Sequence, residues 1–392
     1  MDLKTPSEQF IADVVESRQD SASDFGAAET AFFKLNDLIG KRILLYGNGD
    51  GYITFKCFVV DKYGLEVELI LDSKFSDVCF VDGISAMAPG NYQPDADFCE
   101  SGVVIITVGK TNLYPAIYQE LTVLGFKNII TAFQVYEYHL SHSDFGFIQQ
   151  IVPFLYAQQQ AIHDAYSALM DAKSQHLFIA VLKFYAGVSA VKFAHEPIEY
   201  QYFPHDVPLQ KGFQRVINCG SYDGDTVRQL FKLKGKVAAL ACFEPDPENY
   251  QNLANYLQQS ATTIAEQCVA FPCGVHGRNQ QLKFNSGDRI NSSVSDSGQS
   301  MIQCVALDSA LPNFAPTFIN MDVEGSEPDA LLGARNLISQ HRPDLAICVY
   351  HKPSHLWEIL HLIRGMDASY QFYLRNYTGY PAETVLYCVA AD

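Results

Sequence analysis

The sequence predicts an α/β protein with two separate parallel-sheet domains joined by a helical stretch. First, short apolar segments alternate with helix-like segments over about residues 42–133, an order typical of a parallel sheet covered by helices. Second, the same alternation starts again at residue 214 and continues to the C-terminus. Third, a chain of 392 residues is expected to fold as two or three domains.

The first predicted domain spans residues 41–140 and follows a polar, helix-biased arm at 1–40. It opens with RILLYGNGDG at 42–51, an apolar strand that runs into a glycine turn. The elements expected after that turn are helices at 53–64 and 113–125 and strands at 67–73, 103–109 and 128–133.

A nucleotide site is one interpretation of this first glycine turn. Asp72 ends the second strand about twenty residues later, where a carboxylate can accept hydrogen bonds from ribose hydroxyls. Asp50 in the turn disfavours a pyrophosphate, because like charges repel. A sheet that serves subunit contact, or that shapes a substrate cleft, explains the same residues equally well.

The middle of the chain, residues 141–211, is a predicted helical linker region. The segment YAQQQAIHDAYSALMDAK at 156–173 shows helical spacing of its apolar residues. The most apolar window, 176–194, is interrupted by Lys183 and Lys192. We therefore expect a buried helix followed by a second element there, rather than a membrane span.

Composition excludes several classes of protein. A net charge of −17 repels nucleic-acid backbones and anionic membranes, so we expect no nucleic-acid partner and no membrane insertion. The start of the chain lacks the basic and apolar regions of a signal peptide. The ten cysteines form no CxxC pair and suit a reducing compartment. We predict a cytoplasmic protein that acts on a hydroxylated small molecule or glycan, and we leave a homo-oligomer open.

The second predicted domain spans residues 212–392 and holds more elements than the first. Strands are expected at 215–220, 237–245, 266–275, 317–325, 344–351, 370–377 and 384–391. Helices are expected at 225–235, 247–260, 327–341 and 355–366.

The segment VINCGSYDGDTV after the first of these strands predicts a nucleoside site. Gly220 and Gly224 let a ligand approach the backbone closely. Glu244, at the end of the next strand, is placed to accept hydrogen bonds from two ribose hydroxyls. Asp223 and Asp225 repel a pyrophosphate but suit the cationic groups of S-adenosylmethionine (SAM). The loop therefore favours SAM over NAD, with a loop that merely turns the chain as the structural alternative.

Two further strand ends carry side chains suited to acid–base chemistry. Asp322 and Glu324 lie on a strand-to-helix turn, and His351 ends the next strand. Each also has a structural explanation. Acids cap helix N-termini, for which Ser326 or Glu327 is sufficient, and a histidine can be held by structural hydrogen bonds.

Six segments, in order, resemble the FkbM family of SAM-dependent methyltransferases: VINCGSYDGDTV, CFEPDPENY, VAFPCGV, FINMDVEGSEPDALLGA, RPDLAICVYHKPSHLWEI and FYLRNYTGYPAETVLY. The resemblance runs from about residue 212 to the C-terminus. It implies a class I methyltransferase domain, with a Rossmann-like seven-stranded sheet and SAM as cofactor. It also implies O-methylation of a hydroxyl of a sugar, glycan or polyketide-like molecule. Members often carry an N-terminal extension, which the Rossmann-like first domain resembles.

The resemblance also indicates which residues bind SAM: Asn218, Gly220, Ser221, Asp223, Gly224, Thr226, Glu244, Pro245, Gly274 and Val275. The family usually has an acid where Asn218 stands, and that acid helps to orient the methionine part of SAM. We therefore expect a weaker affinity. The family also usually has an acid where His355 stands, which puts a substrate role of His355 in doubt.

The expected reaction is an in-line displacement, in which alignment of oxygen, methyl carbon and sulfur provides much of the rate. Asp322, Glu324 and His351 are the catalytic candidates, with Asp322 or His351 as the base and Glu324 orienting sugar hydroxyls. A divalent metal held by Asp322 and Glu324, as in some hydroxyl-methylating enzymes, is a further alternative, although hard metal ions usually need more oxygen ligands than these two residues supply. A zinc pair of His351 and His355 is disfavoured by Pro353 between them.

Two interpretations from other classes remain. An NAD-dependent oxidoreductase or epimerase needs a clean GxGxxG and a Tyr-x-x-x-Lys pair, and we find no such pair in a suitable helix. A non-catalytic SAM-binding protein is the other, motivated by Asn218. The methyl acceptor stays unidentified, and the polar loop at 285–300 is a candidate to close over it.

Overall fold

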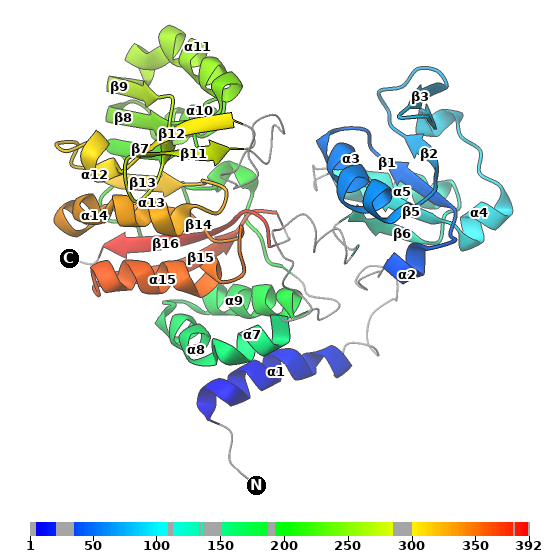
Figure 1. Ribbon diagram of the computed structural model, residues 1–392, viewed down its shortest axis with the longest axis horizontal. Coiled ribbons are helices and arrows are strands. Elements are labelled where there is room, and N and C mark those ends of the chain that lie inside the picture. The colour runs from blue at the N-terminus through cyan, green and yellow to red at the C-terminus, as the bar shows by residue number, and fades with distance from the viewer. Residues whose placement is uncertain are drawn as a thin grey trace. The chain divides into compact units, whose positions relative to one another are not determined.

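The computed structural model describes residues 5–20, 35–108, 113–132, 135, 151–186, 193–284, 300–378 and 381–390. These residues form two compact units, each described by itself below (Figure 1). The C-terminal unit holds the described residues of 1–11, 155–182 and 192–392, and the N-terminal unit holds those of 12–154 and 183–191.

A seven-stranded sheet forms the centre of the C-terminal unit, in the order β15-β16-β14-β13-β7-β8-β9. The strands are β7 (Arg215–Cys219), β8 (Val237–Phe243), β9 (Ala265–Phe271), β13 (Phe318–Met321), β14 (Asp344–Cys348), β15 (Tyr370–Asn376) and β16 (Thr384–Ala390). All neighbours from β14 to β9 pair in parallel, and β16 is antiparallel to both β14 and β15. The Rossmann-like seven-stranded sheet that the family resemblance implies is therefore confirmed.

The helices of this unit follow the strands as the alternating pattern predicts. They are α10 (Asp225–Lys234), α11 (Pro247–Ile264), α12 (Leu307–Ala310), α13 (Glu327–Gly333), α14 (Arg335–His341) and α15 (His355–Met366). The helix expected at 327–341 is divided in two at Ala334, which ends α13 and precedes α14. Strands β14 and β16 are buried along their whole length, which explains why their sequences are continuously apolar rather than alternating.

Helices from the N-terminal half add a layer beside α15 (Figure 1). This layer comprises α8 (Gln159–Ala168), most of α9 (Ala172–Tyr185) and the 3-10 turn η6 (Ile198–Tyr200), whereas α1 (Pro6–Asp20) and α7 (Ile151–Ala157) each contain residues of both units. Helix α8 contacts α15, where His361 Nε2 lies 2.7 Å from the carbonyl oxygen of Ala161. Phe10 of α1 packs against the rings of His163 and Tyr166 in α8.

The apolar window at 176–194 begins inside α9, as expected for a buried helix, and residues 187–192 lie outside the described residues. Among the helices that the structure describes, none combines the length and the apolar character needed to cross a bilayer. Residues 141–150 of the predicted linker are also outside the described part.

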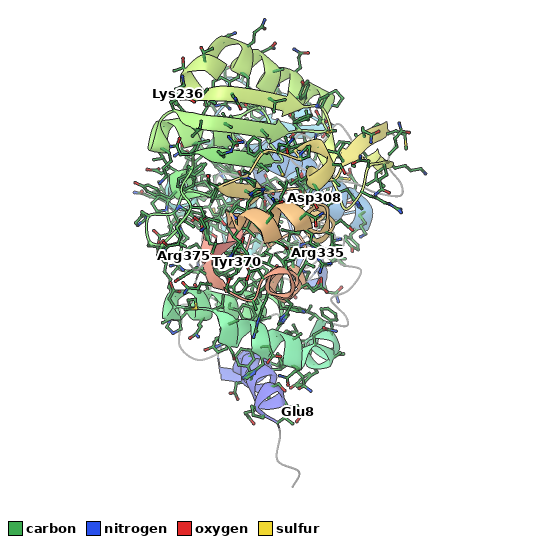
Figure 2. The ribbon with its side chains drawn as sticks, turned by 90° about the vertical axis from the view of Figure 1, so that its left-hand side faces the viewer. Glu8, Lys236, Asp308, Arg335, Tyr370 and Arg375 are labelled. Atoms are coloured by element: carbon green, nitrogen blue, oxygen red, sulfur yellow. The ribbon has the colours of Figure 1, made fainter. Side chains whose placement is uncertain are left out.

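Arg375, near the end of β15, ties the helical layer to the sheet (Figure 2). Its side chain is 2% exposed, and it pairs with Asp171 at 2.8 Å and with Asp206 at 2.7 Å. Lys173 Nζ also lies 2.8 Å from Asp206. Charges from three distant parts of the chain therefore neutralise one another around a buried guanidinium.

A small three-stranded sheet, in the order β10-β12-β11, follows β9. Its strands are β10 (Gly274–Val275), β11 (Gln280–Phe284) and β12 (Ser300–Val305). The single strand predicted at 266–275 is wrong, because the chain leaves β9 at Phe271 and resumes pairing only at Gly274, after Pro272 has removed a backbone donor. The candidate substrate loop at 285–300 lies between β11 and β12, and all of it except Ser300 is outside the described residues.

The N-terminal unit contains a six-stranded sheet in the order β3-β4-β2-β1-β5-β6. Its strands are β1 (Ile43–Tyr46), β2 (Val67–Leu71), β3 (Cys79–Val81), β4 (Ile84–Met87), β5 (Val103–Ile106) and β6 (Ile129–Thr131). Its helices are α2 (Leu35–Leu38), α3 (Asp50–Phe55), the π-helix η1 (Lys56–Asp61), the 3-10 turn η2 (Pro89–Asn91), α4 (Ala96–Ser101) and α5 (Tyr114–Val123).

The predicted α/β alternation of this unit is confirmed, with β1, β2, β4, β5 and β6 forming parallel pairs and β3 antiparallel to β4. The β3–β4 hairpin and α4 are absent from the sequence prediction. The helical arm expected at 1–40 is described only as α1 and α2, since residues 21–34 lie outside the described part.

Candidate active site

The glycine loop after β7 lies in contact with the end of β13. Gly220 has φ +79°, and both Gly220 and Ser221 donate their backbone N–H groups to the carbonyl of Phe243 at 3.0 Å. A Cβ atom on Gly220 would lie 1.8 Å from the backbone oxygen of Asp322. Only glycine fits here, because the backbone is left-handed and the neighbouring strand end leaves no room for a side chain.

Glu244 ties the loop to the end of β8. One carboxylate oxygen accepts a hydrogen bond from the N–H of Tyr222 at 2.8 Å, and the other accepts from the N–H of Asp246 at 2.9 Å. Burial raises the pKa of Glu244 to about 7. Each oxygen of a carboxylate has two lone pairs, so this group retains acceptor capacity for ribose hydroxyls.

Asn218 is buried on β7 beside Asn320 of β13. The Asn320 amide nitrogen donates to the Asn218 side-chain oxygen at 3.1 Å, whereas the Asn218 amide nitrogen has no hydrogen-bond partner in the described part of the chain. A buried amide without a partner is costly. The position expected to orient the methionine part of SAM thus offers a neutral donor instead of a carboxylate.

The charge of the loop differs from the sequence-based expectation. Asp223 is paired with Arg228 at 2.5 Å, so this acid is neutralised from within the protein. Asp225 accepts a hydrogen bond from the backbone N–H of Thr226 at 2.6 Å, and burial raises its pKa. The repulsion of a pyrophosphate is therefore weaker than two free acids would give.

The remaining residues predicted to bind SAM are spread over neighbouring segments. Ser221 is fully buried, and its hydroxyl donates to the carbonyl of Asn218 at 3.1 Å. Gly224 has φ +92° and precedes α10. Pro245 follows Glu244, and Gly274 and Val275 form β10. A Cβ on Gly274 would lie 3.8 Å from Pro245, which places these two predicted residues side by side.

Glu327 is the anchor of the acidic turn after β13, and its side chain is fully buried. One oxygen accepts hydrogen bonds from the backbone N–H groups of Val323 and Gly325, at 3.0 and 3.3 Å. The same oxygen lies 2.9 Å from Nδ1 of His351, and the other lies 3.2 Å from Nδ1 of His355. Burial alone would raise the pKa of Glu327, but the two histidines hold it well below its usual value.

This arrangement answers two expectations about structure. Ser326 makes no side-chain cap on α13, so the capping role falls to Glu327, which bonds the turn that precedes the helix. His351 and His355 both direct Nδ1 to Glu327.

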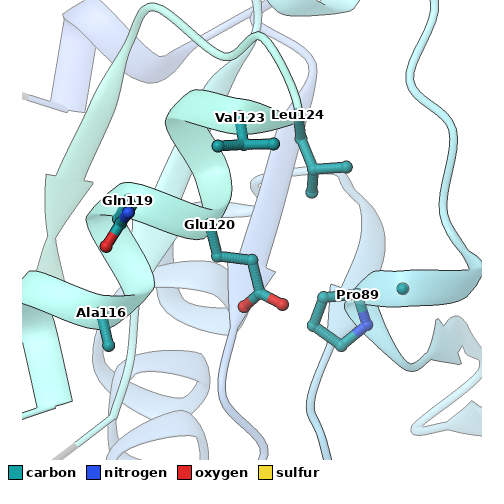
Figure 3. A pocket seen from close by; sticks show the side chains of 7 residues that line it. Pro89, Ala116, Gln119, Glu120, Val123 and Leu124 are labelled. Atoms are coloured by element: carbon teal, nitrogen blue, oxygen red, sulfur yellow. The ribbon is translucent and has the colours of Figure 1, made fainter.

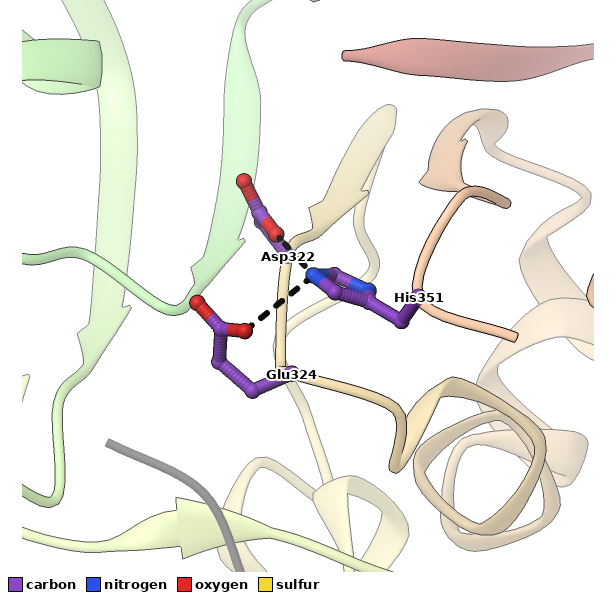
Figure 4. A group of neighbouring side chains, drawn as sticks. All are labelled: Asp322, Glu324 and His351. Carbon is purple, nitrogen blue, oxygen red and sulfur yellow. Dashed lines mark ion pairs between the residues drawn. The ribbon is translucent and has the colours of Figure 1, made fainter. Parts of the chain in front are cut away.

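Asp322, Glu324 and His351 come together at the carboxyl edge of the sheet (Figure 4). Nε2 of His351 lies 3.3 Å from Asp322 Oδ1 and 3.4 Å from Glu324 Oε2. Burial acts to lower the pKa of His351, but Glu327 and Glu324 together raise it well above its usual value. Burial raises the pKa of Asp322 to about 6, against the opposing effect of His351.

Three residues of this site escaped the sequence analysis. The Tyr202 hydroxyl donates to Asp322 Oδ2 at 2.8 Å, and the Tyr350 hydroxyl donates to Asp322 Oδ1 at 3.3 Å. Burial beside Asp322 raises the pKa of Glu383 to about 7, and Gln201 donates to Glu383 at 2.5 Å. Tyr202 comes from a segment that carries no motif, whereas Tyr350 and Glu383 lie inside two of the segments that resemble the family.

Backbone strain is concentrated around the same edge. Tyr202, Glu324 and Glu383 have φ values of +66°, +52° and +57°, although none of them is glycine. Such conformations cost of order 1–3 kcal/mol each and persist where the surrounding structure enforces them, most often at functional sites.

The glycine turn of the N-terminal unit is closed by Asp72. This carboxylate accepts hydrogen bonds from the backbone N–H groups of Asn48 at 2.7 Å and Lys74 at 2.9 Å. A pocket of about 310 Å³ lies elsewhere in this unit (Figure 3). It is lined by Pro89, Gly90, Ala116, Gln119, Glu120, Val123 and Leu124. None of these belongs to the predicted nucleotide turn.

The chain does contain one Tyr-x-x-x-Lys pair, Tyr52 and Lys56, directly after that turn. Tyr52 is buried and donates its hydroxyl to Asp82 at 2.9 Å, while Lys56 pairs with Asp61 at 2.7 Å. Both polar groups are therefore engaged in structural contacts.

Residues 218–374 match the family described as the methyltransferase FkbM domain. The chain is similar in structure to methyltransferase FkbM from Methylobacillus flagellatus KT, with 22% identity, 96% of this chain and 99% of that chain covered, and a TM-score of 0.67. It is less similar to fibrillarin from Aeropyrum pernix, solved with natively bound S-adenosyl-L-methionine, with 10% identity, 48% and 71% coverage and a TM-score of 0.28. No curated protein matches the chain.

Proposed function

Because residues 218–374 belong to the methyltransferase FkbM family, we propose that the C-terminal unit transfers the methyl group of SAM to a hydroxyl of a sugar, glycan or polyketide-like small molecule. The methyltransferase domain lies wholly inside the unit that carries the seven-stranded sheet. The observation that carries the proposal is the contact between the Gly220 loop and Asp322, because it brings the predicted cofactor loop against the acidic turn.

SAM is the cofactor that fits the loop best. Glu244 is buried at the end of the second strand of the fold, where the ribose of a bound nucleoside is expected. The open amide nitrogen of Asn218 is a donor suited to the carboxylate of a methionine group. Neither feature requires a pyrophosphate, which favours SAM over NAD.

In the proposed reaction the hydroxyl oxygen attacks the methyl carbon, the carbon–sulfur bond breaks, and S-adenosylhomocysteine leaves as a neutral thioether. The hydroxyl proton passes to a base. Asp322 is the better candidate for that base, because His351 holds its own proton between three carboxylates. A carboxylate with a pKa of about 6 is ionised at neutral pH and still basic enough to accept a proton.

His351 and Glu324 then have positioning roles. His351 fixes Asp322 from one side while Tyr202 fixes it from the other. Glu324 is about one-third exposed, which leaves its carboxylate accessible to hydroxyl groups of a sugar-like acceptor.

All ten cysteines are free thiols, which supports the predicted cytoplasmic location.

The test is calorimetric titration of the purified protein with SAM and, separately, with NAD, repeated on Glu244→Gln. We expect SAM to bind and the variant to bind it at least about tenfold more weakly, because hydrogen bonds to a charged group are lost. A second measurement then follows the transfer of the labelled methyl group from SAM to hydroxylated acceptors. Binding of NAD without SAM would overturn the proposal, and SAM binding without transfer to any hydroxyl would favour the non-catalytic interpretation.

A further inference from the structure

We propose that Asp322, Glu324 and His351 form a binding site for one divalent transition-metal ion, of which Mn²⁺ is the best probe. One ligand atom from each residue, Oδ1, Oε2 and Nε2, lies within 4.8 Å of the others. From the sequence, a metal held by Asp322 and Glu324 is only an alternative, because these two residues supply too few oxygen ligands. The structure adds an imidazole from the neighbouring strand end.

The distances suit a metal ion. With bonds of about 2.1 Å, two ligand atoms lie about 3.0 Å apart at a right angle and about 3.4 Å apart at a tetrahedral angle. The two carboxylate oxygens lie 3.3 and 3.4 Å from Nε2 of His351, within this range. The ion therefore requires little movement of either oxygen relative to the imidazole.

His351 is oriented like a metal ligand. Its side chain is only 9% exposed, and Oε1 of Glu327 lies 2.9 Å from its Nδ1. A carboxylate beside the far nitrogen holds the ring in place, and such a second contact is typical of histidines that bind metals. Neither ring nitrogen makes a hydrogen bond of acceptable geometry in the described part of the chain, and Nε2 points between Asp322 and Glu324 (Figure 4).

The remaining contacts leave the proposed ligand atoms available. Tyr202 donates its hydroxyl to Oδ2 of Asp322, so Oδ1 is the oxygen directed to His351. Three carboxylates, those of Asp322, Glu324 and Glu327, face this single imidazole. A divalent cation would replace the Nε2 proton of His351 and offset that negative charge.

The mixed ligand set indicates the class of ion. Imidazole suits Zn²⁺, Fe²⁺ and Ni²⁺, whereas carboxylates suit Mg²⁺, Ca²⁺ and Mn²⁺, so two carboxylates with one imidazole favour Mn²⁺, Fe²⁺ or Zn²⁺ over Mg²⁺. Three protein ligands leave coordination positions open, as in catalytic rather than structural sites.

The experiment is titration of chelator-treated, desalted full-length protein with Mn²⁺, in which the EPR signal measures free Mn²⁺, followed by competition with Zn²⁺. We expect one Mn²⁺ per chain, displaced by Zn²⁺. Glu324→Gln, an isosteric change of a partly exposed side chain, should weaken binding at least about tenfold. Asp322→Asn provides a second variant, and Glu266→Gln, an exposed acid on β9, is the matched control that should bind as the native protein does.

Absence of Mn²⁺ and Zn²⁺ binding to the native protein would overturn the proposal, as would unchanged affinity in both Glu324→Gln and Asp322→Asn. Urea midpoints of the variants establish that each is folded when it is titrated. The measurement uses neither SAM nor an acceptor, so a failure of the metal proposal and a failure of the methyltransferase proposal give different results.

Discussion

The two units close the turn after their first strand with the same set of contacts. In the C-terminal unit, the N–H of Gly220 donates to Phe243 at the end of β8, and the N–H of Asp322 donates to Cys219 at 2.9 Å. In the N-terminal unit, Gly47 donates to Leu71 at 2.7 Å, and Thr107 donates to Tyr46 at 2.8 Å. Each unit then ties its turn to an acid on the second strand end.

The units differ at the next strand end. Asp322 presents its carboxylate to His351 and to two tyrosine hydroxyls. Thr107 occupies the equivalent position in the N-terminal unit, and its hydroxyl donates to the backbone carbonyls of Tyr46 and Gly47. A glycine turn with an acid beyond it is therefore a way to close this fold. The chemistry depends on what the neighbouring strand ends add.

The largest expected effect separates these two equivalent positions. Asp322→Asn should lower kcat for methyl transfer by about 10²–10⁴-fold, because it removes the proposed base. Thr107→Val, at the matching place in the N-terminal unit, should leave kcat unchanged. Both are measured with labelled SAM at saturation. Equal losses in the two variants would show that the comparison between the units is false.

Glycine substitutions test the two turns directly. Gly64→Ala is the reference, because Gly64 ends a helix with φ +65° and open space around its Cβ position, so the expected cost is roughly 1–2 kcal/mol. Gly220→Ala also has a positive φ but meets the Asp322 backbone at 1.8 Å, which should add about 1–3 kcal/mol.

The loss of folding stability in Gly47→Ala should lie between the losses in these two variants. Its nearest neighbour is the side chain of Val108 at 2.6 Å, which can move more easily than a backbone carbonyl. Urea unfolding of the three variants gives the order. A Gly220→Ala variant no less stable than Gly64→Ala would contradict the close approach of the two strand ends.

The acids at the second strand ends should differ in their effect on the cofactor. Glu244→Gln should weaken SAM binding by about 10- to 100-fold, since it loses charge-assisted hydrogen bonds to ribose. Asp72→Asn should leave SAM affinity unchanged, because Asp72 serves the N-terminal turn. Calorimetric titration of both variants with SAM measures the two affinities. A loss of SAM affinity in Asp72→Asn would contradict the placement of the cofactor site in the C-terminal unit.

A smaller effect is the pH dependence of SAM binding. The pKa of Glu244 is about 7 in the folded protein, and only its ionised form accepts hydrogen bonds through both oxygens. SAM affinity should therefore rise with pH, by up to about tenfold between pH 6 and 8. The Glu244→Gln variant should lose this rise, and a flat profile in the native protein would contradict it.

The effect of Glu244 on folding stability has the opposite pH dependence from its effect on SAM affinity. Its pKa is raised above the ordinary value of 4.5, so its neutral form is favoured in the folded state. The unfolded chain releases this proton first as pH rises, and stability falls between about 4.5 and 7.

Sequence patterns predicted the buried strands of both sheets, because strands covered on both faces are continuously apolar. They missed the β3–β4 hairpin, in which Phe80 is 75% exposed and Ala86 is buried. A signal for it was available, because Asp82 and Gly83, both with positive φ, form an Asp-Gly turn between two apolar runs. The split of the predicted strand at 266–275 was missed because apolar residues occur on both sides of it.

The residues of the candidate site also differ in whether the sequence could predict them. Asp322, Glu324 and His351 could be selected because parallel strands end at one edge of a sheet. Tyr202 could not, because its place depends on how a distant segment packs. Glu327 was predicted only as a helix cap, and its contacts to two histidines become visible only when the next strand end is in place.

The buried guanidinium of Arg375 has a consequence for dissecting the chain. A fragment that begins at residue 212 keeps every strand of the seven-stranded sheet, yet it loses both Asp171 and Asp206. An uncompensated buried charge typically costs about 3–5 kcal/mol, a large fraction of the stability of an ordinary domain. The smallest autonomous piece that contains the seven-stranded sheet is therefore longer than the sheet itself, and gene fusions or domain exchanges should carry residues 155–211 along with it.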